Sequence, residues 1–586
     1  MRFLRMLSNA LIAGALGATY LTILVLHLNP SFPLSLSAAT PLLLTMGLAY
    51  GLTFAVACYV LIVIRQLISP EALSPGWLSV RVLSWLCTIT AAGGATIMWL
   101  NLRAFTTVLD PPTVTRMTAG AVTLSASAVV FLLISLAHLG RRGGNASAVL
   151  LIAMMAISIA APLAARGEAR ASTGRGGTLS AIVGAEPGRS DPKVVVLALD
   201  GATLDIISPA VAEGRLPGFG RIFDGGAVLH LATIRPTQAE PVWSTVATGR
   251  VPTANGIRAS ALYRVRADGP ALEVLPDYCF AHSLVWFGLL LDHAHAAESL
   301  RTRPLWDILS DAGVPVGFIG WPLTHPAPIV NGFMVSDEFH RLEADDTEVD
   351  QAAAVAPAPL LDEVRTALRG PIAVDPVALV SKIAEAPQGD ADARPDPAPL
   401  AADRMHVQIL EALANRTGAR FLAVRLPGVD AVGHYFLRYA EPSAFGDVSE
   451  AELRQYGRVL DEYYGFIDAL VGRIIDGMRP DDLLIVISGF GMEPLSPGKR
   501  MLERMFGNVR ISGTHERSPD GFLLAYGTAV TRGRPARASL LDFAPTMLYY
   551  LGLPVARDME GFARTDLFRP DFTASRPITF IPTYGR

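Results

Sequence analysis

Residues 193–200 read KVVVLALD, and this stretch decides the fold of the larger part of the chain. A short, uninterrupted apolar run rich in β-branched residues is typical of a strand that is buried on both faces. The run ends on the carboxylate of Asp200. In open α/β sheets, ligand-binding groups gather where parallel strands end. We therefore predict a buried strand here, with Asp200 as a candidate functional residue at its carboxyl end.

The same alternation of short apolar runs and helical segments continues towards the C-terminus. It predicts a helix over residues 216–227, a helix followed by a strand over 303–322, and further strands over 421–430 and 482–492. Strands that alternate with helices indicate an α/β fold with a mostly parallel sheet and flanking helices. Residues 343–403, rich in Ala, Pro and Asp, have only weak periodicity. We predict that they form a cap inserted over the site.

The first 165 residues have a different composition from the rest. The chain has 586 residues, of which 51% are hydrophobic and 17% charged, and long uncharged stretches lie in this first part. A helix that crosses about 30 Å of hydrocarbon needs about 20 apolar residues. Five stretches satisfy this: 7–28, 38–64, 82–100, 118–139 and 146–165. The first is too long for a cleaved signal peptide and four similar stretches follow, so we predict an all-α transmembrane bundle of about five helices. Residues 166–192, rich in Gly, Ala and Arg, predict a flexible linker.

Basic residues in the short loops predict the orientation of these helices. They concentrate before the first helix, between the second and third, and between the fourth and fifth: Arg2, Arg5, Arg65, Arg81, Arg141 and Arg142. Since Lys and Arg accumulate on the cytoplasmic side, the N-terminus is predicted to be cytoplasmic. Five crossings then place residues 193–586 outside, in a multi-pass protein of the inner (plasma) membrane whose partner is the lipid bilayer. A net charge of −4 argues against a nucleic-acid partner.

Six short motifs follow one another in the second part of the chain. They are LALDGAT (197–203), PVWSTVATGRVPTANGI (241–257), GWPLTHPAP with NGFMVSD (320–337), DAVGH (430–434), GTHERSPDGFL (513–523) and LLDFAPTMLYYLGLPVARDMEG (540–561). By these motifs, residues 193–568 resemble the alkaline phosphatase superfamily, and within it the type I phosphodiesterase/nucleotide pyrophosphatase branch. The resemblance implies an alkaline-phosphatase-like sheet and two zinc-type ions that clamp a phosphoryl group. It also implies a Thr or Ser, at the start of a helix, that attacks phosphorus.

One of the family's two metal sites has a complete counterpart in this sequence. An Asp-x-x-x-His motif and a late histidine correspond to Asp430, His434 and His515. One carboxylate and two imidazoles make a three-ligand site with a fourth position open for substrate. The three cysteines, Cys58, Cys87 and Cys279, cannot supply a thiolate zinc site in the soluble part. The resemblance thus implies one divalent metal, with zinc favoured over manganese.

The second metal site departs from the family pattern. Asp200 matches the ligand that ends the first strand, but the family's Asp-His pair is replaced by Gly489 and Phe490. Neither residue offers a ligand to a hard cation. The position of the attacking hydroxyl is occupied by Ala239. The resemblance therefore implies one complete metal site and one incomplete site.

Two functions remain open on this basis. In the first, which we favour, the protein is an extracytoplasmic metal-dependent phosphodiesterase or phosphotransferase that acts on a phosphorylated envelope lipid or glycan. Asp200, or the new carboxylate Glu240, would serve as general base, with Thr237 as a substitute nucleophile and Asp200 also as a metal ligand. The anchored architecture is similar to that of phosphoethanolamine transferases. In the second, the domain is an inactive pseudoenzyme that binds phosphorylated envelope substrates or scaffolds an envelope complex.

Overall fold

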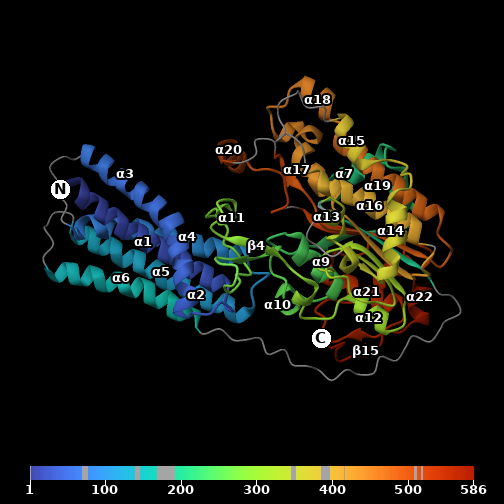
Figure 1. Ribbon diagram of the computed structural model, residues 1–586, viewed down its shortest axis with the longest axis horizontal. Helices are drawn as coiled ribbons and strands as arrows, with labels where there is room; N and C mark the ends of the chain where they lie inside the picture. The colour runs from blue at the N-terminus through green and yellow to red at the C-terminus, as the bar shows by residue number, and fades with distance from the viewer. Residues whose placement is uncertain are drawn as a thin grey trace. The chain divides into compact units, whose positions relative to one another are not determined.

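The chain folds into two compact units, which are described separately (Figure 1). The helical unit comprises Met1–Gly174 and Ala261–Ala294, and the sheet unit comprises Arg175–Ser260 and His295–Arg586. The computed structural model describes residues 2–68, 77–138, 145–167, 192–344, 351–383, 396–414, 416–506, 511–516 and 519–585. The predicted linker, 166–192, falls almost entirely outside these residues. The assignment of residues 261–294 to the helical unit was not predicted from the sequence.

The described part of the helical unit contains five helical spans that are long and apolar enough to cross a membrane. They are α1 (Arg2–Leu28), α2 (Leu36–Met46) continued through η1 (Gly47–Gly51) into α3 (Leu52–Ile68), α4 (Val80–Ala104), α5 (Pro111–Ala137) and α6 (Asn145–Arg166). The five predicted apolar helices are thereby confirmed. At the contact of α1 with η1, a Cβ atom on Gly14 would lie 2.3 Å from the carbonyl oxygen of Gly51. Only glycine at position 14 permits this close approach.

The sheet unit is built on a nine-stranded sheet in the order β13-β2-β12-β9-β1-β8-β5-β6-β7. The strands are β1 (Val194–Leu199), β2 (Ala227–Ala232), β5 (Val316–Trp321), β6 (Gly332–Ser336), β7 (Val355–Ala356), β8 (Phe421–Leu426), β9 (Leu483–Phe490), β12 (Asp520–Tyr526) and β13 (Ala538–Ser539). Strand β12 runs antiparallel to β2 and β9, and β7 antiparallel to β6; the remaining pairs are parallel. This confirms the predicted mostly parallel sheet.

The register of the central strands brings three strand ends together at one edge of the sheet. All six residues of β1 are buried. Leu199, the last of them, pairs with Leu426 of β8 on one side and with Ser488 of β9 on the other. The segments that follow Leu199, Leu426 and Ser488 therefore begin side by side. These segments contain the residues that the sequence singles out.

Helices cover both faces of the sheet (Figure 1). Leu197 and Leu199 share a core with α7 (Leu204–Ala212), α8 (Pro217–Gly225), α16 (Pro397–Leu413), α17 (Gly428–Ala440) and α19 (Val459–Asp476). On the other side lie α9 (Ala239–Thr248), α12 (Leu305–Asp311) and α21 (Phe543–Tyr550). The alternation of side chains along β1 thus supplies two cores, as expected for a parallel sheet between helix layers.

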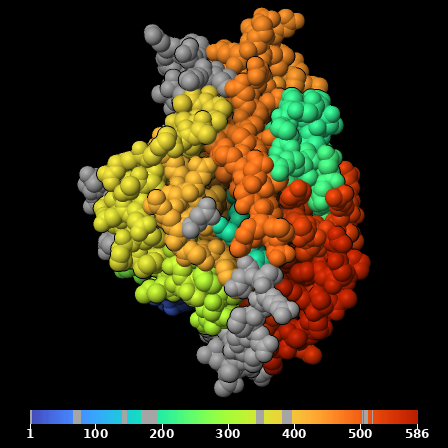
Figure 2. All heavy atoms as spheres, turned by 90° about the vertical axis from the view of Figure 1, so that its right-hand side faces the viewer, coloured from blue at the N-terminus to red at the C-terminus, as the bar shows by residue number. Residues whose placement is uncertain are grey.

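The segment that we expected to form a cap, 343–403, has a different place in its described parts. It contributes the edge strand β7 and the helices α14 (Leu361–Leu368) and α15 (Pro376–Ile383), which pack with α16. Val364 and Val380 are buried in the same core as Leu197. Figure 2 shows this part of the chain, in yellow to light orange, on one face of the molecule. The segment extends the sheet and one helix layer, because its few apolar residues fall on the inner faces of short helices.

Candidate metal centre

Asp430 and His434 lie on the same face of helix α17. Strand β8 ends at Leu426, and α17 begins at Gly428, so Asp430 lies in the first turn of a helix rather than at the end of a strand as we had predicted. Side chains four residues apart face the same way on a helix. The carboxylate Oδ2 of Asp430 is 3.4 Å from Nε2 of His434. The helix therefore explains the spacing of the Asp-x-x-x-His motif.

His515 reaches the same place from another part of the chain. It follows β11 (Gly513–Thr514), which pairs with β10 (Glu493–Pro494). The rings of His434 and His515 are 5.2 Å apart. Nδ1 of His434 is 2.8 Å from the carbonyl oxygen of Gly513, and Nδ1 of His515 is 3.0 Å from that of Thr237. A carbonyl partner requires Nδ1 to carry the proton, which leaves both Nε2 atoms as ligands.

These three residues suit a divalent cation. One potential ligand atom from each of Asp430, His434 and His515 lies within 4.8 Å of the others. The Oδ1 atom of Asp430 is buried and accepts no hydrogen bond. A buried carboxylate oxygen without a partner is costly, and a cation would remove that cost. Two imidazoles and a carboxylate are a donor set that zinc prefers.

The pKa shifts of Asp430 and His434 agree with a cation site formed by these residues. Burial by itself raises the pKa of the Asp430 carboxyl, but His434, His515 and Arg425 together bring that pKa below its ordinary value. For His434, burial lowers the pKa, and the neighbouring Asp430 raises it above the ordinary value. Asp430 is therefore ionised at neutral pH, as a metal ligand must be.

Asp200 is held in a different way. The side chain of Arg425, on β8, places Nε 3.0 Å and Nη2 2.6 Å from Oδ2 of Asp200. Nε1 of Trp243 donates to Oδ1 at 2.6 Å. Burial raises the pKa of Asp200, and the positive charge and hydrogen bonds of Arg425 oppose that rise. Both oxygens are thus engaged by donors, and among the described residues Asp200 does not belong to the metal-ligand cluster.

Apolar packing fills the space where the family's second pair of ligands would lie. A Cβ atom on Gly489 would lie 2.2 Å from Cγ1 of Val242, on helix α9. Phe490 is fully buried, and its ring centroid is 5.0 Å from that of His515. Gly489 therefore allows α9 to approach β9 closely, and Phe490 supports the ring of a metal-ligand candidate. At the two positions where the resemblance expects ligands, the structure has packed apolar groups.

The two remaining predicted residues lie at the start of α9. Glu240 is in the first turn of this helix; its Oε2 atom is buried without a hydrogen-bond partner, and its charge interacts with that of Arg425. The Thr237 hydroxyl is buried and donates to the carbonyl oxygen of Ile234 at 3.0 Å. The backbone carbonyl of Thr237 thus contacts the candidate ligand His515. Its hydroxyl is already used in the hydrogen bond to Ile234.

Sequence reasoning missed Arg425 and Trp243. Arg425 is a single basic residue inside a buried apolar strand, FLAVRL, and such a residue usually marks a specific buried partner. It faces three carboxylates, those of Asp200, Glu240 and Asp337. Burial raises the pKa of Asp337 to about 6, even though the amide groups of two residues donate to it. The isolated arginine was the signal that could have identified this ion pair.

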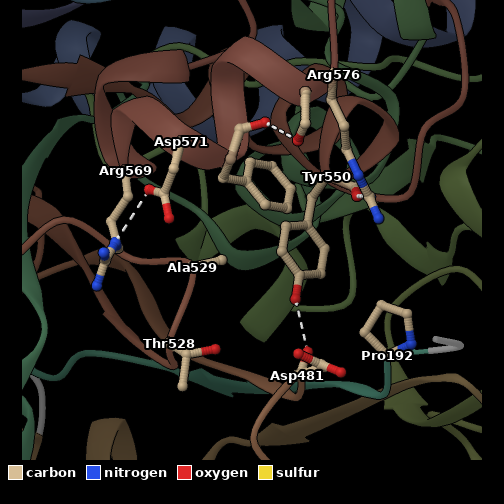
Figure 3. Close-up of a pocket in the computed structure, with 10 residues that line it drawn as sticks. Pro192, Asp481, Thr528, Ala529, Tyr550, Arg569, Asp571 and Arg576 are labelled. Carbon is tan, nitrogen blue, oxygen red and sulfur yellow. Dashed lines mark hydrogen bonds and ion pairs between the residues drawn. The ribbon is translucent and has the colours of Figure 1, made fainter. Parts of the chain in front are cut away.

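A separate pocket lies at the opposite end of the central strands (Figure 3). It has a volume of about 420 Å³, and its lining includes Pro192, which precedes β1, and Asp481, which precedes β9. The Tyr550 hydroxyl donates to the carbonyl oxygen of Asp481 at 3.0 Å, and Arg569 pairs with Asp571 at 3.1 Å. Because these strands enter the sheet here, the pocket is remote from their carboxyl ends and from the metal-ligand candidates.

The sheet unit has the α/β fold of the alkaline phosphatase superfamily, and Asp430, His434 and His515, which we call the triad, could hold a metal ion at the carboxyl edge of its sheet. Residues 194–536 match the family described as type I phosphodiesterase/nucleotide pyrophosphatase, and the chain belongs to this family. A solved structure of murine ectonucleotide pyrophosphatase/phosphodiesterase 5, an inactive variant in complex with AMP, is 13% identical. The match covers 64% of this chain and 100% of that chain, with a TM-score of 0.37. No curated protein matches the chain.

Proposed function

We propose that this protein is a membrane-anchored phosphodiesterase or phosphotransferase that acts outside the cytoplasm on a phosphoester of an envelope lipid or glycan. The observation that supports this most directly is the convergence of Asp430, His434 and His515 on one point. These residues would hold one divalent metal ion, zinc in preference to manganese. The five apolar spans and the basic residues of the alternate loops support the anchor and its orientation.

The described side chains divide the chemistry between them. A divalent ion bound by the triad would polarise the phosphoryl oxygens and offset their charge. Arg425 neutralises Asp200 and keeps a positive charge beside Asp430, where the family otherwise has a second cation. With Asp200 engaged, Glu240 is the carboxylate left to act as general base.

The proposed reaction is a single displacement at phosphorus. The oxygen of water, or of an acceptor alcohol, forms the new bond to phosphorus while its proton passes to Glu240. The bond from phosphorus to the leaving alcohol breaks, and the departing oxygen takes up a proton from solvent. Since the position of the covalent nucleophile is Ala239 and the Thr237 hydroxyl is already engaged, no phosphoenzyme is required.

The test uses the full chain reconstituted in lipid. We expect one zinc equivalent per chain, lost in His434→Ala and retained in the control His230→Ala, which removes an exposed histidine of β2. Turnover of bis-p-nitrophenyl phosphate should be slow, absent in Asp430→Ala, and strongly reduced in Glu240→Gln with the metal retained. A chain that binds no metal at all would refute the proposal. Rapid turnover with two zinc equivalents would refute the single-metal form of it.

A non-catalytic role is the second candidate. It is favoured by the replacement of two ligands with the packed contact of Gly489 and Val242. A binding protein would retain zinc in the triad and hold phospholipid vesicles in a zinc-dependent manner, but would release no product from any phosphodiester. The Glu240→Gln variant separates the two candidates, because it should leave vesicle binding unchanged while it lowers turnover.

A further inference from the structure

Residues 261–294 interrupt the sequence of the sheet unit and fold with the apolar helices. The segment contains β3 (Ala261–Arg264) and β4 (Leu291–Ala294), which pair with each other, and the short helix α11 (Ser283–Trp286). We refer to it as the insertion. Its location in the helical unit needs a physical cause, because in sequence it is far from the apolar helices and both its neighbours belong to the sheet unit.

Two buried asparagines attach the insertion to the ends of helices. Asn29 follows α1 directly; its Nδ2 atom donates to the carbonyl oxygen of Val274 at 2.7 Å, and its Oδ1 atom accepts from the amides of Glu273 and Val274 at 2.7 and 2.9 Å. Asn101, near the end of α4, exchanges two bonds of 2.9 and 2.8 Å with the backbone of Asp277. Each amide side chain thus satisfies the insertion's backbone as a neighbouring strand would.

Both attachment points lie at the same end of the bundle. If the N-terminus is cytoplasmic, as the loop charges predict, then α1 and α4 both end outside. A segment that belongs in sequence to the sheet unit can reach only the side where that unit lies. The hydrogen bonds of Asn29 and Asn101 therefore agree with the predicted five crossings, which place the ends of α1, α4 and α6 on one side.

Next to these attachment points, the insertion exposes large aromatic side chains. Tyr278, Phe280, Trp286 and Phe287, which we call the aromatic cluster, are 48 to 77% exposed. The rings of Trp286 and Phe287 lie 4.7 Å apart. Tyr278 and Phe280 have φ angles of 63° and 56°, a left-handed conformation that disfavours bulky residues. The backbone is thus strained at two residues whose aromatic side chains are exposed. If these side chains faced water, no contact would offset the strain.

We propose that the aromatic cluster inserts into the outer leaflet of the membrane, at the level of the lipid headgroups, beside α4. Trp and Tyr favour this interface because one end of the side chain is apolar and the other polar. Trp99 and Leu100, which precede Asn101 on α4, are also exposed apolar residues near this end of the bundle. In Figure 1, α11 lies next to the end of the bundle, to one side of it.

The loop between the aromatic residues packs against an apolar span. Cys279 is buried and lies next to Tyr50, which is near the middle of the apolar span Leu36–Ile64. The exposed side chains on either side of Cys279, those of Tyr278 and Phe280, therefore lie beside this apolar span. This position distinguishes a lipid-facing cluster from a protein-binding patch that projects into water.

The chain passes between the two units at residues 174 and 175. It passes between them twice more, at the start and at the end of the insertion. In the sheet unit, the amide of Ser260, the residue before the insertion, donates to Oε1 of Gln238 at 2.7 Å, and Gln238 directly precedes α9. The residue before the insertion is therefore held next to the start of α9 within the sheet unit. This inference does not depend on catalysis or on metal binding.

The test places a fluorescent label in the aromatic cluster. Trp286→Cys in the full chain is labelled with a nitrobenzoxadiazole dye and reconstituted in vesicles whose lipids carry a spin-label quencher near the headgroup. Glu450→Cys on α18 (Glu450–Tyr456), exposed in the sheet unit, is the matched control. The native cysteines are buried, so the parent chain measures background labelling. A second variant, Phe280→Cys, provides the same measurement if the first fails to fold.

We expect several-fold stronger quenching by lipid at position 286 than at position 450, and the reverse order with aqueous iodide. Equal quenching at both positions would overturn the proposal. Protection of position 286 from both lipid and iodide would also overturn it, because a second copy of the chain or another protein would then cover the cluster. Neither result depends on turnover, so failure here is distinguishable from failure of the proposed function.

Discussion

The two halves of the candidate site contain the same kinds of groups in opposite states. In one half, Asp430 and His434 are partly open, with side chains 23% and 27% exposed, and Oδ1 of Asp430 accepts no hydrogen bond. In the other half, Asp200 is only 4% exposed and has donors on both oxygens. The first half can accept a cation from solution. The second already contains one, the guanidinium of Arg425.

The difference shows how a buried carboxylate can be stabilised without a metal ion. A buried carboxylate deprived of its cation would be strongly destabilising. Arg425 supplies the missing charge, Trp243 a further donor, and the contact of Gly489 with Val242 fills the volume. Charge, hydrogen bonding and packing have therefore changed together. In the half that contains Asp200, the buried polar groups of Asp200, Arg425 and Trp243 have partners, so this half is stable without a metal ion.

The largest expected effect comes from breaking the ion pair. Arg425→Gln leaves Asp200 buried without a cation and should lower the free energy of unfolding by about 3–5 kcal/mol. The measurement is the denaturant midpoint of the full chain in detergent, followed by circular dichroism. Arg454→Gln is the matched control, because Arg454 pairs with Glu450 on the surface, and such pairs contribute at most about 1 kcal/mol.

A double variant sharpens this test. Asp200→Asn with Arg425→Gln removes both charges, so most of the stability lost in Arg425→Gln should return. If Arg425→Gln were as stable as the parent chain, then Asp200 would need no cation and our account of this half would be wrong.

A second prediction concerns the half that contains Asp200, when the family's ligand types are introduced into it. Gly489→Asp with Phe490→His restores the family's ligand types, but the new Cβ at position 489 would overlap Val242. We expect a loss of about 1–3 kcal/mol, as for other overpacked cores. The zinc content should remain one equivalent per chain by atomic absorption, because Arg425 still occupies Asp200. A second equivalent of zinc would show that the half containing Asp200 lacks only ligands, and that Arg425 and the packing do not prevent metal binding.

The sequence was most informative where the structure depends on local patterns. The apolar run before Asp200 predicted β1, and the four-residue spacing of Asp430 and His434 needs only one helix. The partner of Asp200 could not be predicted in this way, because Arg425 is 225 residues away in sequence. The same holds for the insertion, whose bond from Asn29 to Val274 spans 245 residues.

Segments without periodicity were also poorly predicted. Residues 343–403 suggested a cap because they are rich in Ala, Pro and Asp and their periodicity is weak, whereas the described helices α14 and α15 bury Val364 and Val380 in the main core. A few well-placed apolar residues suffice for a short helix that packs on a large layer. Such placement depends on the layer and cannot be read from the segment alone.

The smallest expected effect tests the finer part of the comparison, the donor from Trp243. Trp243→Phe removes one hydrogen bond to Asp200 while Arg425 remains, so the free energy of unfolding should fall by about 1 kcal/mol, the typical net value of a hydrogen bond. The loss should depend on pH. Trp243 favours the ionised form of Asp200, and removing it raises further a pKa that burial already raises. A group with a raised folded-state pKa contributes most at low pH and destabilises as pH rises through that pKa. The difference between Trp243→Phe and the parent chain should therefore be larger at neutral pH than in mild acid, with zinc content unchanged. A difference independent of pH would mean that Trp243 contributes by packing alone, and that Arg425 by itself keeps Asp200 ionised.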